Sequence, residues 1–223
     1  MREVVLDTET TGLSAKNGDR LVEIGCVELI NHLPSGQVYH QYINPGVSMP
    51  REAEEVHGLS DKFLSDKPGF SEIADGFLDF IAAAPLIIHN APFDMGFINS
   101  ELVRIKRNPL PSIQAIDTVS MARKRYPGSP ASLDALCRRF EIDNTARTLH
   151  GALLDAELLA EVYLELIGGR QPGLVLANSF LDDSNSKEIE RINRNPRPHQ
   201  PTAEELIAHK DFINQLKNPI WED

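Results

Sequence analysis

A chain of 223 residues with 41% hydrophobic and 25% charged residues is typical of a soluble globular protein with one sizeable domain and an appendage. Its net charge of −11 excludes capture of nucleic acid by a long-range positive field. No apolar run reaches the about 20 residues of a membrane span, and residues 1–3 lead into a strand rather than a signal peptide. Cys26 and Cys137 lack metal-ligand spacing and indicate reduced core residues of a cytoplasmic protein.

Apolar runs and turn-forming residues predict strands at the start of the chain, then an alternation of strands and helices. Connections between the first three strands are too short for a helical crossover, so these strands form an antiparallel meander. Pro34 and Gly36 predict a turn within residues 31–36. The predicted strands span residues 4–12, 21–30, 37–43, 85–90 and 113–118.

Capping residues mark the ends of the predicted helices. Ser60, Ser71 and Ser132 are predicted N-caps, and Pro92 suits the first turn of a helix. Gly168 ends the last helix of this part of the chain. The predicted helices span residues 51–56, 71–81, 93–106, 132–140 and 149–167. The fold class is therefore α/β, a mixed five-stranded sheet flanked by helices.

The composition changes after residue 169. Residues 181–201 are polar and contain three prolines, which predicts a flexible linker. Thr202 and Glu205 then form a capping-box pattern that opens a short helix. We predict a domain over residues 1–169, a connecting segment over 170–201 and a C-terminal segment over 202–223. The last segment is too small to fold well alone.

Two carboxylates lie at the end of the first buried strand. Asp7 and Glu9 are two residues apart, so in a strand their side chains point to the same face. Like charges this close resist ionisation, and a divalent cation such as Mg²⁺ or Mn²⁺ relieves their repulsion. The alternative is a strand end with two solvated acids, since Asp-x-Glu is a common pattern.

Two further acids complete a candidate set of oxygen ligands. Asp94 lies in the first turn of a helix directly after a strand, where an acid is also favourable for the helix dipole alone. Asp155 lies in an otherwise apolar helix, between Leu154 and Ala156. An exposed position on that helix is one explanation of Asp155, and a bound metal explains it better.

His150 precedes Asp155 by five residues, which is about 140° around an ideal helix, so the two side chains do not share a face. If both serve one site, His150 projects from the loop or frayed turn before the helix, and Gly151 favours that approach. Histidine titrates near neutrality, as a general base requires. A lone histidine is also often a capping or solvent-exposed residue.

Together these residues predict metal-dependent hydrolysis of a nucleic acid. Four carboxylates can hold two Mg²⁺ ions that clamp the attacking and leaving oxygens of a phosphodiester. One metal lowers the pKa of a bound water, His150 takes its proton, and the other metal stabilises the leaving 3′ oxygen. The predicted products are nucleoside 5′-monophosphates.

Three motifs resemble, in order and spacing, those of the DEDD superfamily and of its histidine-containing DEDDh branch of 3′–5′ exonucleases. They are Asp7-Thr8-Glu9, His89-Asn90-Ala91-Pro92-Phe93-Asp94 and His150-x4-Asp155. The resemblance covers about residues 4–168 and implies a ribonuclease H-like fold. Within it, residues 133–156 are similar to the proofreading (epsilon-type) subunits of bacterial DNA polymerase III.

The resemblance implies a role for each matching residue. Two divalent cations, Mg²⁺ or Mn²⁺, would be held by Asp7, Glu9, Asp94 and Asp155, with His150 as the general base. The terminal nucleotide of a single-stranded DNA 3′ end would contact Asp7, Glu9, Thr10, Gly12, His57, Phe93 and Asp155. His89 and Asn90 would line the same site, although ordinary loop hydrogen bonding also explains His57, His89 and Asn90.

The tail resembles segments that bind replication partners. Gln171, Leu174 and Leu176 are similar to the peptide that enters the beta sliding clamp, and an apolar loop is the alternative. Leu206, Phe212 and Trp221 lie in a segment similar to the one that docks on the polymerase III alpha subunit. A small theta subunit is a further possible partner. Tethering in a cytoplasmic replisome would deliver DNA to an acidic nuclease.

Other functions are compatible with the same residues. An exoribonuclease of the same superfamily would trim RNA 3′ ends, and the docking tail argues against it. A non-catalytic subunit would use the fold only to brace a polymerase, and a purely structural set of carboxylates is a third alternative. Candidate contacts to the DNA backbone are Arg104, Lys106, Arg107 and residues 123–125, which also fit solvated surfaces.

Overall fold

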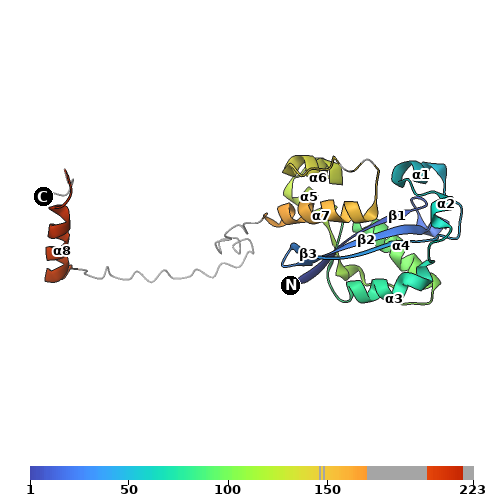
Figure 1. The fold of residues 1–223 in the computed structure, drawn as a ribbon, viewed down its shortest axis with the longest axis horizontal. Helices are drawn as coiled ribbons and strands as arrows, with labels where there is room; N and C mark the ends of the chain where they lie inside the picture. Colours follow the sequence, from blue (N-terminus) through green and yellow to red (C-terminus); the bar gives the residue numbers. More distant parts are fainter. Residues whose placement is uncertain (146, 148, 170–199, 218–223) are drawn as a thin grey trace, which may run out of the picture. The chain divides into compact units, whose positions relative to one another are not determined.

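A computed structural model describes residues 1–145, 147, 149–169 and 200–217 of the chain. One five-stranded sheet forms the centre of residues 1–169, in the spatial order β3-β2-β1-β4-β5 (Figure 1). Neighbouring strands are antiparallel in β3-β2-β1 and parallel in β1-β4-β5. The bounds are β1 Arg2–Thr10, β2 Leu21–Ile30, β3 Leu33–Tyr42, β4 Leu86–Ile88 and β5 Ala115–Asp117. The predicted mixed sheet is confirmed.

Helices cover both faces of this sheet, as Figure 1 shows. On one face lie α3 (Phe70–Ile81) and α4 (Ala91–Arg104), and on the other lie α5 (Thr118–Arg125), α6 (Leu133–Phe140) and α7 (Ala152–Ile167). The short helices α1 (Arg51–His57) and α2 (Asp61–Leu64) follow β3. Single 3₁₀ turns span Ala15–Asn17 and Ser112–Gln114.

The alternation of β1 decides which side chains meet which helices. Val4 and Leu6 are buried in the core that includes the apolar residues of α3 and α4. Val5 is buried in the other core, with the apolar residues of α6 and α7. Because side chains alternate along a strand, Thr8 continues the face of Leu6, and Asp7 continues the face of Val5. The backbone of β1 alone therefore sets the direction of each acid at its end.

The turn between β2 and β3 differs from the sequence prediction. The predicted turn at 31–36 is wrong in its extent, because β3 begins at Leu33 and includes Pro34 and Gly36. Asn31 and His32 alone make the turn, with φ of 53° and 68°. This is the left-handed conformation that two-residue hairpin loops require, and Asn adopts it more readily than most residues.

The starts of α3 and α5 also differ from the prediction. Ser71 lies inside α3, because Gly69 is the N-cap and its backbone N–H donates to Glu72 Oε1 at 2.8 Å. The helix α5 was not predicted, and its N-cap is Asp117, whose carboxylate accepts from the Val119 N–H at 3.1 Å. The last strand residue and the helix cap are thus the same residue, which conceals the boundary in the sequence. Ser60 and Ser132 are N-caps as predicted.

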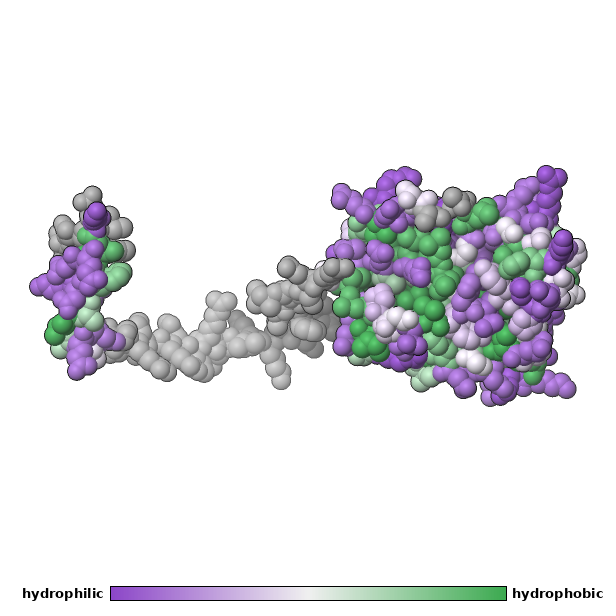
Figure 2. Space-filling model, viewed as in Figure 1, coloured by the Kyte–Doolittle hydropathy of each residue, from purple (hydrophilic) through white to green (hydrophobic). Residues whose placement is uncertain are grey.

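The described part of the tail forms one helix, α8 (Ala203–Ile213). Its predicted capping box is present: Glu205 N–H donates to Thr202 Oγ1 at 3.3 Å, and Thr202 N–H donates to Glu205 Oε2 at 2.8 Å. Leu206, Ile207 and Phe212 are each more than half exposed, and apolar and polar residues share the surface of this helix (Figure 2). Among the described residues, no helix has the length and apolarity to cross a membrane.

Candidate active site

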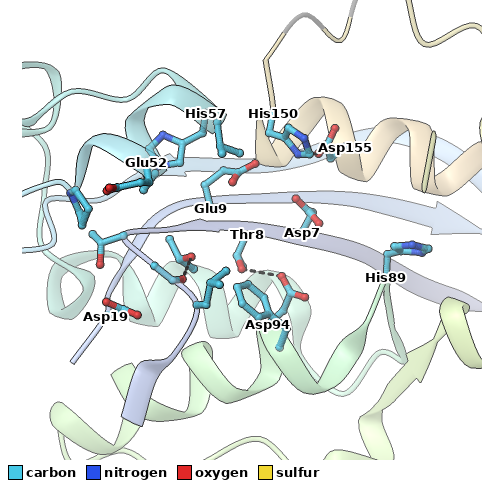
Figure 3. Close-up of a pocket in the computed structure, with 18 of the residues that line it drawn as sticks. Asp7, Thr8, Glu9, Asp19, Glu52, His57, His89, Asp94, His150 and Asp155 are labelled. Atoms are coloured by element: carbon cyan, nitrogen blue, oxygen red, sulfur yellow. Dashed lines mark hydrogen bonds and ion pairs between the residues drawn. The ribbon is translucent and has the colours of Figure 1, made fainter. Parts of the chain in front are cut away.

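A cavity of about 770 Å³ lies where the carboxyl end of β1 meets α4, α1 and the start of α7 (Figure 3). It brings together side chains that are up to 148 positions apart in the sequence, from Asp7 to Asp155. Its lining includes ten of the predicted site residues: Asp7, Glu9, Thr10, Gly12, His57, His89, Phe93, Asp94, His150 and Asp155.

The end of β1 supplies groups to two sides of the cavity. Asp7 and Glu9 point toward α7 and Asp155, whereas Thr8 points the opposite way, toward α4 (Figure 3). The Thr8 hydroxyl donates to Asp94 Oδ1 at 2.7 Å, and both residues are buried. The predicted same-face arrangement of Asp7 and Glu9 is confirmed, and Thr8 adds a direct link from this strand to the third acid.

Asp94 is placed by the way that α4 begins. The N-cap Asn90 has φ of 68°, a left-handed conformation that turns the chain sharply from β4 into the helix. Asp117 Oδ1 accepts from the backbone N–H groups of Asn90 at 3.0 Å and Ala91 at 3.4 Å. Asn90 is exposed and does not line the cavity, so its visible contribution is to this turn.

Asp155 is placed by a close approach of α7 to the sheet. Gly25 of β2 pairs directly with Asp7 of β1. A Cβ on Gly25 would overlap the backbone at Ala152 and Leu153, the first residues of α7. Only a glycine lets the helix start lie this close to the strand, and Asp155 follows within the first turn of the helix.

Replacing Gly25 with Ala should therefore push the start of α7 away from Asp7. We expect a loss of stability of about 1–3 kcal/mol from overpacking, together with a displacement of Asp155. Gly96→Ala on α4 is the matched control, since a Cβ there meets no atom within 4 Å. Urea unfolding of both variants measures the effect, and equal stabilities would contradict it.

His150 lies outside the helix that follows it. The helix α7 starts at Ala152, later than the predicted residue 149, so His150 projects from the preceding loop as the spacing argument requires. Its backbone N–H donates to the Val56 carbonyl at 3.1 Å, which joins this loop to α1 across the cavity. The His150 side chain is 47% exposed, and its Nδ1 lies 3.3 Å from Asp155 Oδ2.

Three acids of the cavity, Asp7, Glu9 and Asp94, resist ionisation. Burial raises the pKa of Asp7 well above its usual value, and the charges of Asp94, Glu9 and Asp155 raise it further. Burial and the charges of Asp155, Glu23 and Asp94 raise the pKa of Glu9 to about 8. Burial raises the pKa of Asp94 to about 7, although the Thr8 hydrogen bond opposes this. Such a cluster favours binding of a cation.

The donor set fits a divalent metal. One ligand atom each from Glu9, His150 and Asp155 lies within 4.8 Å of the others, and the partly buried Asp7 and the buried Asp94 line the same cavity. Carboxylate oxygens are the ligands that Mg²⁺ and Mn²⁺ prefer. Unpaired buried carboxylates are costly, and a bound cation offsets that cost.

Two more histidines line the cavity. The His57 Nδ1 accepts from the Leu59 N–H at 3.0 Å, so the ring hydrogen is on Nε2. That buried Nε2 has no hydrogen-bond partner within the described ranges. His89 Nδ1 lies 2.9 Å from the Thr118 hydroxyl. Burial lowers the pKa of both imidazoles, which favours the neutral rings.

Sequence reasoning assigned no role to Arg147, which lines the same cavity. Its guanidinium Nε donates to Asp155 Oδ1 at 2.5 Å, and its Nη2 donates to Asp155 Oδ2 at 2.6 Å. Burial lowers the pKa of Arg147, but the ion pairs with Asp155 and Asp134 outweigh it, and the net shift is upward. An arginine three residues before the candidate base was the only sequence signal.

Tail residues complete the predicted set. Leu206 and Phe212 are exposed on α8. The remaining tail residues with a predicted role lie outside the described residues: Gln171, Leu174, Leu176 and Trp221. Their predicted roles stay predictions.

Comparison with known proteins agrees with this geometry. Residues 4–163 match the RNase_T family, which is described as Exonuclease. The nuclease domain of 3′hExo, a DEDDh family member bound to rAMP, has a similar fold with a TM-score of 0.65 and 15% identity. That similarity covers 74% of this chain and 91% of the 3′hExo chain.

Curated relatives are similar over nearly the whole length. DNA polymerase III subunit epsilon of Rickettsia felis is 48% identical over 97% of this chain and 97% of its own. DNA polymerase III subunit epsilon of Escherichia coli is 44% identical over 97% of this chain and 93% of its own. The chain therefore belongs to the exonuclease family that includes the epsilon subunits of bacterial DNA polymerase III.

Proposed function

We propose that this chain is a proofreading 3′–5′ exonuclease of a bacterial replicative DNA polymerase. It removes mispaired nucleotides from DNA 3′ ends by phosphodiester hydrolysis and releases nucleoside 5′-monophosphates. One observation carries the proposal: buried acids from β1, α4 and α7 share a single cavity with His150. The near full-length similarity to DNA polymerase III subunit epsilon supports the assignment to a polymerase.

Members of this exonuclease family normally use divalent metal ions. For this chain we propose two, Mg²⁺ or Mn²⁺, held by Asp7, Glu9, Asp94 and Asp155. Bound metals would activate the attacking water and stabilise the leaving oxygen. The protein holds the ligands in place before any metal arrives, since β1, α4 and α7 are fixed by the two cores on either side of the sheet.

His150 is the proposed general base. Its side chain is half exposed at the cavity, where it can accept a proton from water and pass it to solvent. Asp155 lies close enough to stabilise the imidazolium that forms.

The terminal nucleotide is proposed to occupy the cavity beside these acids. Its sugar and base would contact Thr10, Gly12, His57 and Phe93, in addition to Asp7, Glu9 and Asp155. The buried Nε2–H of His57, which has no hydrogen-bond partner in the described part of the chain, suits a hydroxyl oxygen of the sugar. His89 would line the site, and Asn90 would act through the turn that places α4.

We assign the remaining residues to partner binding. The proposed organisation is a nuclease domain over 1–169, a clamp-binding segment and linker over 170–201, and a polymerase-docking segment over 202–223. Gln171, Leu174 and Leu176 would bind the beta sliding clamp, and Leu206, Phe212 and Trp221 the alpha subunit. A theta-type subunit is a further proposed partner. The protein would then act in the cytoplasm, at the replisome.

The test is digestion of a 5′-labelled primer–template with a mismatched 3′ end. We expect a ladder that shortens from the 3′ end with Mg²⁺ and disappears with excess EDTA. A matched RNA primer tests the exoribonuclease alternative, which predicts faster cleavage of RNA than of DNA. Folded protein that leaves both substrates intact with Mg²⁺ or Mn²⁺ would contradict the proposed function and favour a bracing role.

A further inference from the structure

Arg147 is the only Lys or Arg among the described residues that line the active-site cavity. Its side chain is 9% exposed, and the guanidinium touches three other side chains. Besides the two bonds to Asp155, Nη2 lies 2.8 Å from His150 Nδ1, and Nη1 donates to Asp134 Oδ1 at 2.6 Å. One cation therefore contacts a proposed metal ligand, the proposed base and an acid outside the cavity.

The contact with His150 fixes the position of the ring hydrogen. A guanidinium has only donors, so the nitrogen that faces it must present its lone pair. With Nδ1 engaged by Arg147, a neutral His150 carries its hydrogen on Nε2. Both ring nitrogens are then in use, and this tautomer cannot accept a proton from water. The base is blocked for as long as Arg147 stays in place.

The contact with Asp155 occupies the same atoms that a metal needs. Arg147 bonds to both carboxylate oxygens of Asp155 with the parallel geometry of a bidentate pair. Its positive charge also opposes the rise in the pKa of Asp7 and Glu9, so both carboxylates interact with it electrostatically. A divalent cation at these oxygens would meet a like charge in a poorly solvated site. Arg147 and the metal therefore compete for Asp155.

Asp134 gives Arg147 a second anchor. It lies on α6, its side chain is 54% exposed, and it also accepts from Asn144 Nδ2 at 3.2 Å. If Arg147 leaves Asp155, it can keep the Asp134 ion pair without remaining unpaired in a buried position. Breaking a buried pair is costly when one charge is left unpaired, and this second acid reduces that cost.

We propose that Arg147 is a positioning residue that acts as an internal substitute for the metal. The guanidinium neutralises Asp155 and holds His150 in the tautomer that cannot act as a base. A divalent cation held by Asp155 would take the place of the guanidinium there, and Arg147 would keep its ion pair with Asp134 and leave His150 Nδ1. The base is thus released only when the site is loaded. This inference rests on the proposed metal-dependent function.

Mn²⁺ binding to the full-length protein, followed by electron paramagnetic resonance, tests the competition. Arg147→Gln should bind Mn²⁺ with a Kd about 10-fold lower than that of the wild type, because the competing charge is gone. Arg138→Gln is the matched control, since it removes the same charge from the exposed face of α6. Arg147→Lys keeps the charge and loses the two-nitrogen fork, so its Kd should lie between that of Arg147→Gln and that of the wild type.

The ¹⁵N resonances of His150 test the coupling to the base. In the wild type, Mg²⁺ should lower the population of the His150 tautomer that carries its hydrogen on Nε2. In Arg147→Gln, the metal-free spectrum should already lack that preference. A Kd equal to that of Arg138→Gln, or a weaker one, would overturn the inference, and if the Gln variant does not fold, Arg147→Lys decides in the same way. A wild type that binds no Mn²⁺ would instead contradict the proposed function.

Discussion

Replacement of Asp94 by Asn should lower exonuclease activity by about 10³-fold and, at the same time, stabilise the metal-free protein at pH 8. Activity falls because Asp94 is one of the proposed metal ligands and a neutral amide binds a divalent cation weakly. The side-chain volume is unchanged, and the amide oxygen can still accept from the Thr8 hydroxyl. The loss of activity therefore does not come from a change in packing.

The stabilisation has a separate cause. Asp94 is 3% exposed, and its pKa of about 7 means that ionisation at pH 8 is unfavourable in the folded protein. An amide avoids that cost. Asp79→Asn is the control, since Asp79 is exposed on α3, on the far side of the sheet from α7. Primer digestion with Mg²⁺ and thermal unfolding in EDTA measure the two effects. Full activity in Asp94→Asn would contradict the ligand assignment.

The metal-free protein should become less stable as the pH rises from 5 to 8. The pKa of Asp94 rises from 3.8 to about 7 on folding, and that of Glu9 rises from 4.5 to about 8. Between the unfolded-state and the folded-state pKa of each acid, the folded protein binds more protons than the unfolded chain, so stability falls with increasing pH. The protonated acids make their full stabilising contribution below about pH 4, and this contribution is lost as the pH rises past their folded-state pKa values.

A shift of three pKa units corresponds to about 4 kcal/mol, or roughly 10 °C in Tm for a domain of this size. Thermal unfolding in EDTA across this pH range should show that decrease. Saturating Mg²⁺ should remove most of it, because the ionised acids then have a cation to bind. Glu9→Gln should have a shallower pH dependence than the wild type in EDTA. A Tm that is constant or rises from pH 5 to 8 without metal would contradict the assigned acid cluster.

Local patterns in the sequence determined most of the fold and the identity of the acids. The alternation of Val4 to Glu9 predicts a strand whose two acids share a face, and this holds because side-chain direction in a strand follows from backbone geometry alone. The capping patterns at Ser60, Ser132 and Thr202 were likewise sufficient, since each cap bonds within four residues.

Tertiary structure alone decided how these acids meet and which other groups join them. No local pattern reveals that Gly25 admits the start of α7, because its neighbours Ala152 and Leu153 are more than 120 residues away. The Thr8–Asp94 bond and the contacts of Arg147 with Asp155 and Asp134 likewise depend on packing between separate elements. Sequence patterns identify the residue types that can bind a metal. Long-range packing sets the distances between these residues, the pKa values of the acids and the contact of Arg147 with Asp155.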